Sequence, residues 1–211
     1  MEYLAAALLA AEIIYCIVCA ARLRKDGQTG RLAAWVTALC AASDLAFLLP
    51  RLLAKWLLPE LPFLWIGMGA LADGILSTVA WLLLYLAWER AYAGGVRDRL
   101  VFWTAMGGAL LRLLAWAASA ANLLRGTDTR FWVLVRLFPL CFLASAAVAA
   151  WRSVRQTSRA LRWFWLLLIA ALALRFCTAA LDSKFDSVTL RLPLLFVHTA
   201  INACLFTASK K

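Results

Sequence analysis

Charged residues are scarce in this 211-residue sequence, at 16%, whereas hydrophobic residues make up 65%. In a soluble domain about a quarter of the residues are charged, and the mean hydropathy of +0.84 is also far too high for one. The chain has one histidine, so that a zinc or catalytic site built on several imidazoles is not available to it. These shortages exclude a soluble fold and indicate an integral membrane protein.

Long apolar segments between clusters of charge indicate how often the chain crosses the bilayer. A helix needs roughly 20 mostly apolar residues to span the hydrocarbon core. Seven such segments occur, at residues 3–21, 32–50, 62–88, 100–121, 131–151, 161–181 and 190–208. The sequence therefore predicts an all-α integral membrane protein of seven transmembrane helices, with residues 1–211 forming a single transmembrane domain. The first segment lacks a basic leader and contains Glu12, so we expect it to be retained as a helix.

The net charge of +11 is distributed in a way that orients the protein, and nucleic acid is not an expected partner. Thirteen basic residues follow the odd-numbered segments, and only six lie in the alternate loops, where Arg191 is counted. Cytoplasmic loops carry the excess of lysine and arginine. We therefore predict a multipass protein of the cell membrane, with its N-terminus outside and its C-terminus in the cytoplasm.

Cysteine usage argues against a disulfide framework. All six cysteines, at positions 16, 19, 40, 141, 177 and 204, lie in apolar segments, where cysteine packs as a small hydrophobe. Cys16 and Cys19 are spaced C-x-x-C, but no second pair accompanies them. No metal site and no cofactor are predicted.

Two short matches indicate an internal duplication. Gln28-Thr29-Gly30-Arg31 recurs as Gln156-Thr157-Ser158-Arg159 at an offset of 128, with both copies expected in cytoplasmic loops. Leu61-Pro62-Phe63-Leu64 recurs as Leu192-Pro193-Leu194-Leu195 at an offset of 131. We predict a 3+1+3 parallel repeat: a first three-helix repeat (1–90), a linker helix (91–125) and a second repeat (126–211). Such repeats are common in transporters, with solute sites at the repeat interface.

This layout resembles the superfamily of SWEET sugar transporters, PQ-loop transporters and KDEL receptors, and the local likeness is the segment Gly27-Gln28-Thr29-Gly30-Arg31. The resemblance implies a 3+1+3 bundle that transports or binds a small solute. The chain departs from the pattern because it has no Pro-Gln pair and its prolines do not match the SWEET arrangement. Microbial opsins share the layout, but the last segment has no lysine before Lys210 to carry retinal.

Charged and polar residues inside the segments are the candidate substrate-binding residues, because charge in the bilayer core is costly and usually paired or functional. They are Glu12, Asp44, Asp73, Arg112, Arg136, Arg175, His198 and Asn202. The acids lie in the first repeat and the arginines in the linker helix and second repeat, which predicts pairing across the interface, with Asp44 and Arg175 as the first pair. Together these residues predict a cavity, open to the outside, that suits a carboxylate or phosphate.

Three functional classes remain open. A further alternative is that the buried charges only fix the register of the helices and bind no ligand. The leading hypothesis is a transporter of a small anionic or polar solute, and the second is a ligand-binding receptor or sensor without transport. The third is an intramembrane enzyme, since Ser43-Asp44-Leu45-Ala46-Phe47-Leu48-Leu49-Pro50 resembles an element of the lysoplasmalogenase family, which cleaves a lysolipid. Asp44 and Asp73 could act there as acid and base, but no catalytic residue is assigned. The bilayer and a small solute are the expected partners, and a homo-oligomer is possible.

Overall fold

The computed structural model describes residues 2–25, 27–57, 63–92, 99–127, 129–153, 159–181 and 187–208. In this part of the chain every regular element is an α-helix. The helices are α1 (Glu2–Leu23), α2 (Gly27–Trp56), α3 (Phe63–Tyr92), α4 (Arg99–Leu124), α5 (Arg130–Ser153), α6 (Arg159–Leu181) and α7 (Ser187–Ala208). The all-α prediction is confirmed, and each predicted segment corresponds to one helix.

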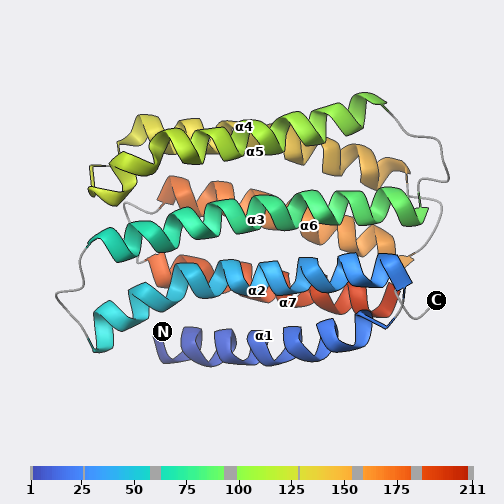
Figure 1. Ribbon diagram of the computed structural model, residues 1–211, viewed down its shortest axis with the longest axis horizontal. Helices are drawn as coiled ribbons and strands as arrows, with labels where there is room; N and C mark the ends of the chain where they lie inside the picture. Colours follow the sequence, from blue (N-terminus) through green and yellow to red (C-terminus); the bar gives the residue numbers. More distant parts are fainter. Residues whose placement is uncertain are drawn as a thin grey trace.

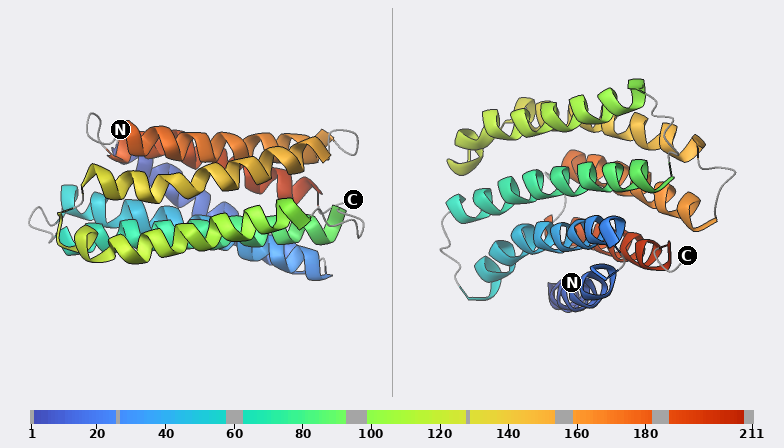
Figure 2. Two further views of the ribbon diagram at one scale, coloured as in Figure 1. Left: turned by 90° about the horizontal axis from the view of Figure 1, so that it is seen from above. Right: turned by 45° about the vertical axis from the view of Figure 1, so that its right-hand side comes forward.

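The helices run along one common direction and pack in the order of the sequence (Figure 1). Each helix contacts the next, and α7 returns to pack against both α1 and α2. The bundle is thereby closed, with its first and last helices as neighbours (Figure 2). The N-terminus and the C-terminus lie at opposite ends of the bundle (Figure 1).

Length and composition make five of the described helices able to cross a membrane: Tyr3–Leu23, Ala34–Trp56, Phe63–Leu86, Arg99–Leu124 and Arg130–Arg152. The apolar parts described for α6 and α7 are shorter, at Leu166–Cys177 and Arg191–Ile201. Large apolar side chains cover the outside of the bundle, for example Ile14 at 64% exposure, Trp103 at 68% and Phe138 at 62%. An apolar surface of this extent suits lipid and supports the prediction of a membrane protein.

Two apolar clusters leave a polar layer between them on α2. The larger cluster includes Val36 of α2 with residues of α3 to α7, and the smaller one joins Leu48 and Leu52 to α1 and α7. Ser43 and Asp44 lie between these positions on α2 and are fully buried. The helix therefore carries its polar residues into the interior at a level bounded by apolar packing on both sides.

Helix α2 is longer than the predicted segment 32–50 at both ends. Gln28-Thr29-Gly30-Arg31, expected in a loop, belongs to its first turns, and Pro50, expected at its end, lies inside it. Proline removes one helical hydrogen bond, so Pro50 leaves the carbonyl of Ala46 without its usual N–H partner. That carbonyl lies against Gly69 of α3, where an added Cβ would stand less than 3.0 Å from its oxygen. Helix α2 thus continues past the hydrogen bond that is missing at Pro50, and at this level it packs closely against α3.

Several glycines allow neighbouring helices to pack closely. An added Cβ would meet the Leu123 backbone at Gly67, the Trp116 ring at Gly74 and Phe142 at Gly108. Gly107 is different, because nothing lies within 4 Å of the position of its Cβ. The small residues therefore bring α3 close to α2 and α4, and α4 close to α5.

Replacing Gly69 with alanine tests this packing. We expect Gly69→Ala to lower the free energy of unfolding by about 1–3 kcal/mol, because its Cβ would press on a backbone carbonyl that cannot rotate away. Gly107→Ala is the matched control, and it should be neutral or slightly stabilising because the position is open. Unfolding in mixed micelles with increasing denaturing detergent, followed by circular dichroism, measures both. Equal effects of the two substitutions would contradict the predicted α2–α3 contact.

Candidate functional site

Two buried carboxylates share one guanidinium at the centre of the site. Arg191 of α7 donates from Nε to Asp44 Oδ1 at 2.8 Å. Its Nη1 and Nη2 donate to the two oxygens of Asp73 at 3.2 and 2.5 Å. Asp44 of α2 is fully buried, and Asp73 and Arg191 are each 5% exposed. One guanidinium thus joins α2, α3 and α7, in the forked geometry for which arginine is suited.

A second guanidinium, from α6, closes the network on Asp73. Arg175 Nη1 lies 3.2 Å from Asp73 Oδ2, and Arg175 Nη2 donates to Asp73 Oδ1 at 3.3 Å. Ser43 Oγ of α2 also donates to Asp73 Oδ1. We call these four charged residues, Asp44, Asp73, Arg175 and Arg191, the ion network. Every charge in it has a partner of opposite sign within ion-pair distance.

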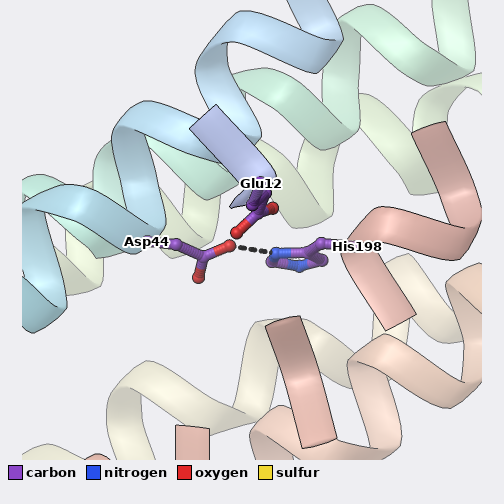
Figure 3. Close-up of side chains that lie close together, drawn as sticks. All are labelled: Glu12, Asp44 and His198. Atoms are coloured by element: carbon purple, nitrogen blue, oxygen red, sulfur yellow. Dashed lines mark hydrogen bonds and ion pairs between the residues drawn. The ribbon is translucent and has the colours of Figure 1, made fainter. Parts of the chain in front are cut away.

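Beside the ion network, an imidazole and two carboxyl groups converge from three helices (Figure 3). His198 Nδ1 of α7 lies 2.5 Å from Asp44 Oδ2, and the Glu12 carboxyl of α1 points toward the same two side chains. Glu12 is 2% exposed, and neither of its oxygens has a hydrogen-bond partner among the described residues. We call Glu12, Asp44 and His198 the carboxyl–imidazole cluster.

This cluster has ligand atoms within 4.8 Å of one another, but its surroundings do not favour a metal ion. Both oxygens of Asp44 are already occupied, one by Arg191 and the other by His198. The Arg191 guanidinium would also repel a cation bound at Asp44. We assign no metal ligand and no cofactor to these residues.

Two further arginines are buried on α4 and α5. Arg112 Nε donates to Thr78 Oγ1 at 2.9 Å, and no described residue forms an ion pair with Arg112, which is 5% exposed. Arg136 Nη1 donates to Ser119 Oγ at 3.2 Å, and its guanidinium lies over the Trp116 ring, 4.8 Å from the centroid. Each of these two guanidinium groups therefore donates a hydrogen bond to a hydroxyl group.

An internal cavity of about 50 Å³ lies among helices α2 to α7. Its polar lining consists of Ser43, Ser77, Thr78, Trp81, Arg112, Arg175 and His198. No carboxylate is among the lining residues, and the rest of the wall is Cys40 and aliphatic side chains. The Trp81 indole Nε1 is a buried donor without a partner in the described part of the chain. The cavity has room for a few waters or one small ligand, and two arginines are among the residues that line it.

The structure brings together five of the eight predicted residues: Glu12, Asp44, Asp73, Arg175 and His198. Arg112 reaches the same region across the cavity, whereas Arg136 does not line it. Asn202 lies in α7, but its side chain is outside the described residues. Two of the three acids, Asp44 and Asp73, pair with arginines across the bundle, and Glu12 does not. The first predicted pair is replaced: Arg175 pairs with Asp73, and Asp44 pairs with Arg191.

Arg191 is the residue that the sequence interpretation missed, because it was counted among the loop charges. The helix begins at Ser187 rather than at residue 190 and includes Pro193. Proline is tolerated in the first turns of a helix, where its missing N–H matters least. The predicted segment 190–208 already contained Arg191 near its start. Counting Arg191 with the helix instead of the loop would have placed it inside the bundle and left five basic residues in the outer loops instead of six.

Removing the shared guanidinium tests the ion network as the element that holds the bundle. We expect Arg191→Gln to lower the free energy of unfolding by about 3–5 kcal/mol, because two buried carboxylates lose their common partner. Arg51→Gln is the matched control. Arg51 lies over the Phe47 ring at 3.7 Å and donates to its carbonyl, so its loss should cost only about 1 kcal/mol. Detergent unfolding curves of both variants measure the difference, and an equal effect would count against a central role of Arg191.

Comparison with known proteins adds no name to this site. No family model matches the chain. No curated protein and no solved structure matches it significantly either. The functional argument therefore depends on the geometry and charge of the residues described above.

Proposed function

We propose that this protein is a multipass transporter of a small anion, which binds in the cavity among α2 to α7. The observation that carries the proposal is the set of residues around the cavity: Arg112 and Arg175 line it, and no carboxylate does. An arginine buried in a membrane bundle without an acidic partner is costly, and such residues commonly mark ion or substrate pathways. An anion in the cavity would supply the missing partner of Arg112.

The chemistry of the wall also favours one size and shape of ligand. Guanidinium forks match planar or tetrahedral oxyanions, and the aliphatic wall formed by Leu140, Leu143 and Leu172 suits a short apolar group. The volume limits the ligand to a few heavy atoms unless the helices move apart. Small carboxylates, sulfonates and inorganic oxyanions fit these conditions better than sugars, which need many balanced donors and acceptors.

The proposal includes all seven helices as membrane spans, with the N-terminus outside the cell. Helices α6 and α7 have 23 and 22 residues, which gives roughly 33 Å at 1.5 Å per residue, enough to cross the hydrocarbon core. The basic loops on one side support the orientation. The 3+1+3 repeat remains part of the proposal, with α1–α3 and α5–α7 as the two halves.

The ion network lies where these two halves would meet. Asp44 and Asp73 come from the first half, and Arg175 and Arg191 come from the second. Transporters with parallel repeats move one bundle against the other around a fixed site. In this protein the motion would exchange or strain ion pairs across the interface, so substrate in the adjacent cavity would be positioned to influence it.

A hydrolase is the second candidate, since Ser43 and His198 both line the cavity and His198 contacts Asp44. The hydrogen bonds oppose it. Ser43 donates to Asp73, whereas a nucleophilic serine would donate to the histidine base. Both aspartates are also held by Arg191, which would hinder an acid–base exchange between them. A receptor without transport has the same binding site and differs only in lacking flux.

Anion binding is tested with purified protein in detergent. Nitrate, methanesulfonate and phosphate should raise the melting temperature saturably, whereas neutral sugars should not. Arg112→Gln should weaken anion affinity about 10- to 100-fold, because it removes a charged donor from the wall. Arg51→Gln, the matched substitution outside the cavity, should bind as the wild type does.

Flux separates the three classes. In proteoliposomes, uptake of a labelled anion that saturates and is lost in Arg112→Gln is the expected result. Binding without uptake would identify a receptor, and turnover of a lysolipid would identify the hydrolase. Equal anion affinity of wild type and Arg112→Gln would refute the cavity as the binding site.

A further inference from the structure

We infer that the carboxyl–imidazole cluster of Glu12, Asp44 and His198 binds one exchangeable proton, and that this proton moves together with the anion. The inference rests on the proposed function and adds its driving ion: the protein would be a proton–anion symporter. It is carried by three observations on the described residues: the absence of a hydrogen-bond partner for Glu12, the charge balance of the cluster and the ion network, and the position of His198, which belongs to the cluster and also lines the cavity.

Glu12 is a buried carboxyl group without a hydrogen-bond or ion-pair partner among the described residues. It is 2% exposed, and the charged groups that act on it are the acid Asp44 and the base Arg191. A carboxylate without hydrogen bonds in such a place is strongly destabilised unless it is neutralised, whereas a protonated carboxyl can donate to a nearby acceptor. The carboxylate of Asp44 lies beside it (Figure 3). A proton on this group, shared within the cluster, removes the destabilisation.

Within the ion network and the carboxyl–imidazole cluster, acids outnumber guanidinium groups by one. Glu12, Asp44 and Asp73 provide three carboxyl groups, and Arg175 and Arg191 provide two guanidinium groups. With His198 neutral, these residues together carry one net negative charge; Arg112 is also buried but forms no ion pair with any described residue. A single proton, on Glu12 or on His198, brings the network and the cluster together to neutrality, and a membrane interior strongly favours neutrality.

The ionisable residues around the cluster, on each helix packed against it, favour the binding of a proton over that of a larger cation. On α1 and α2 the ionisable neighbours are the thiols of Cys16, Cys19 and Cys40. On α3 and α6 they are Asp73 and Arg175, which are paired with each other. On α7, Arg191 occupies Asp44 Oδ1 at 2.6 Å. A proton needs no open coordination sphere, whereas a larger cation would have to displace Arg191 or His198 from Asp44.

His198 connects the proton to the anion. Its Nδ1 contacts Asp44, and the residue also lines the cavity. When the proton is on the imidazole, the cavity wall gains a positive charge and anion binding becomes more favourable; when an anion is bound, it stabilises the protonated cluster in the same measure. Anion affinity should therefore rise as the pH falls, and the loaded forms should carry both ions or neither.

Proton-coupled uptake in proteoliposomes tests the inference. Nitrate and methanesulfonate are suitable probes, because anions of strong acids cannot carry a proton across the bilayer themselves. With the wild type, an inwardly directed proton gradient should drive accumulation of the labelled anion, and anion uptake should acidify the lumen, as reported by an entrapped pH dye. Glu12→Gln should retain exchange of labelled for unlabelled anion but lose both gradient-driven accumulation and acidification.

Two further variants control for disturbance of the helices. Cys19→Ala changes an equally buried side chain on the same helix and should transport as the wild type does. His198→Gln should lose the pH dependence of anion affinity in detergent, a readout that does not require a working transport cycle. Gradient-driven accumulation that persists in Glu12→Gln, or that follows added Mn²⁺ or Zn²⁺ instead of the pH gradient, would overturn the inference.

Infrared spectroscopy tests the proton site even if no probe anion binds. Difference spectra between acidic and alkaline buffer should show a carboxyl or imidazole band that titrates in the wild type and is lost or shifted in Glu12→Gln. Such a band without anion binding would refute the transport proposal and leave the proton site standing. Identical difference spectra of wild type and Glu12→Gln would refute the proton site.

Discussion

The free-energy cost of placing charge inside a membrane bundle governs this structure, and Arg191 lowers that cost by forming ion pairs with both Asp44 and Asp73. One guanidinium bonds to two carboxylates, so the three helices that carry them must lie at one register. Arg175 and Ser43 then complete the coordination of Asp73. Shifting α7 by one residue would rotate Arg191 by about 100° away from both acids. The polar interior thus determines how the apolar helices are aligned.

A proline on α2 and a glycine on α3 allow Arg191 to contact both Asp44 and Asp73. Pro50 frees the Ala46 carbonyl of α2, and Gly69 of α3 allows that carbonyl to approach closely. Asp44 lies two residues before Ala46 on α2, and Asp73 lies about one turn after Gly69 on α3. The close approach of α2 and α3 therefore brings two like charges near enough to share a cation, which would otherwise be an unfavourable arrangement.

Buried polar groups in the described part of the chain fall into two kinds. The members of the ion network satisfy one another and account for alignment and stability. Arg112, Glu12 and the indoles of Trp81, Trp116 and Trp151 are less satisfied. Arg112 and Trp81 line a cavity that lacks carboxylates, and Glu12 lies beside an acid and an imidazole. The proposed anion and proton sites are built on Arg112 and Glu12.

Composition and charge spacing by themselves determined that the chain is all-helical and apolar enough for a membrane, because long apolar segments have few alternatives to a helix in lipid. They also singled out most of the buried ionisable residues, since each interrupts an apolar segment, with the exception of Arg191. The partners were decided only by tertiary structure. Arg191 was taken for a loop charge because it lies at the edge of the predicted segment 190–208, and Asp44 was assigned to Arg175 from matching depth alone. Depth does not specify which face of a helix a side chain occupies, and the rotation of α6 and α7 about their axes, set by packing, gave Arg175 to Asp73 and Arg191 to both acids.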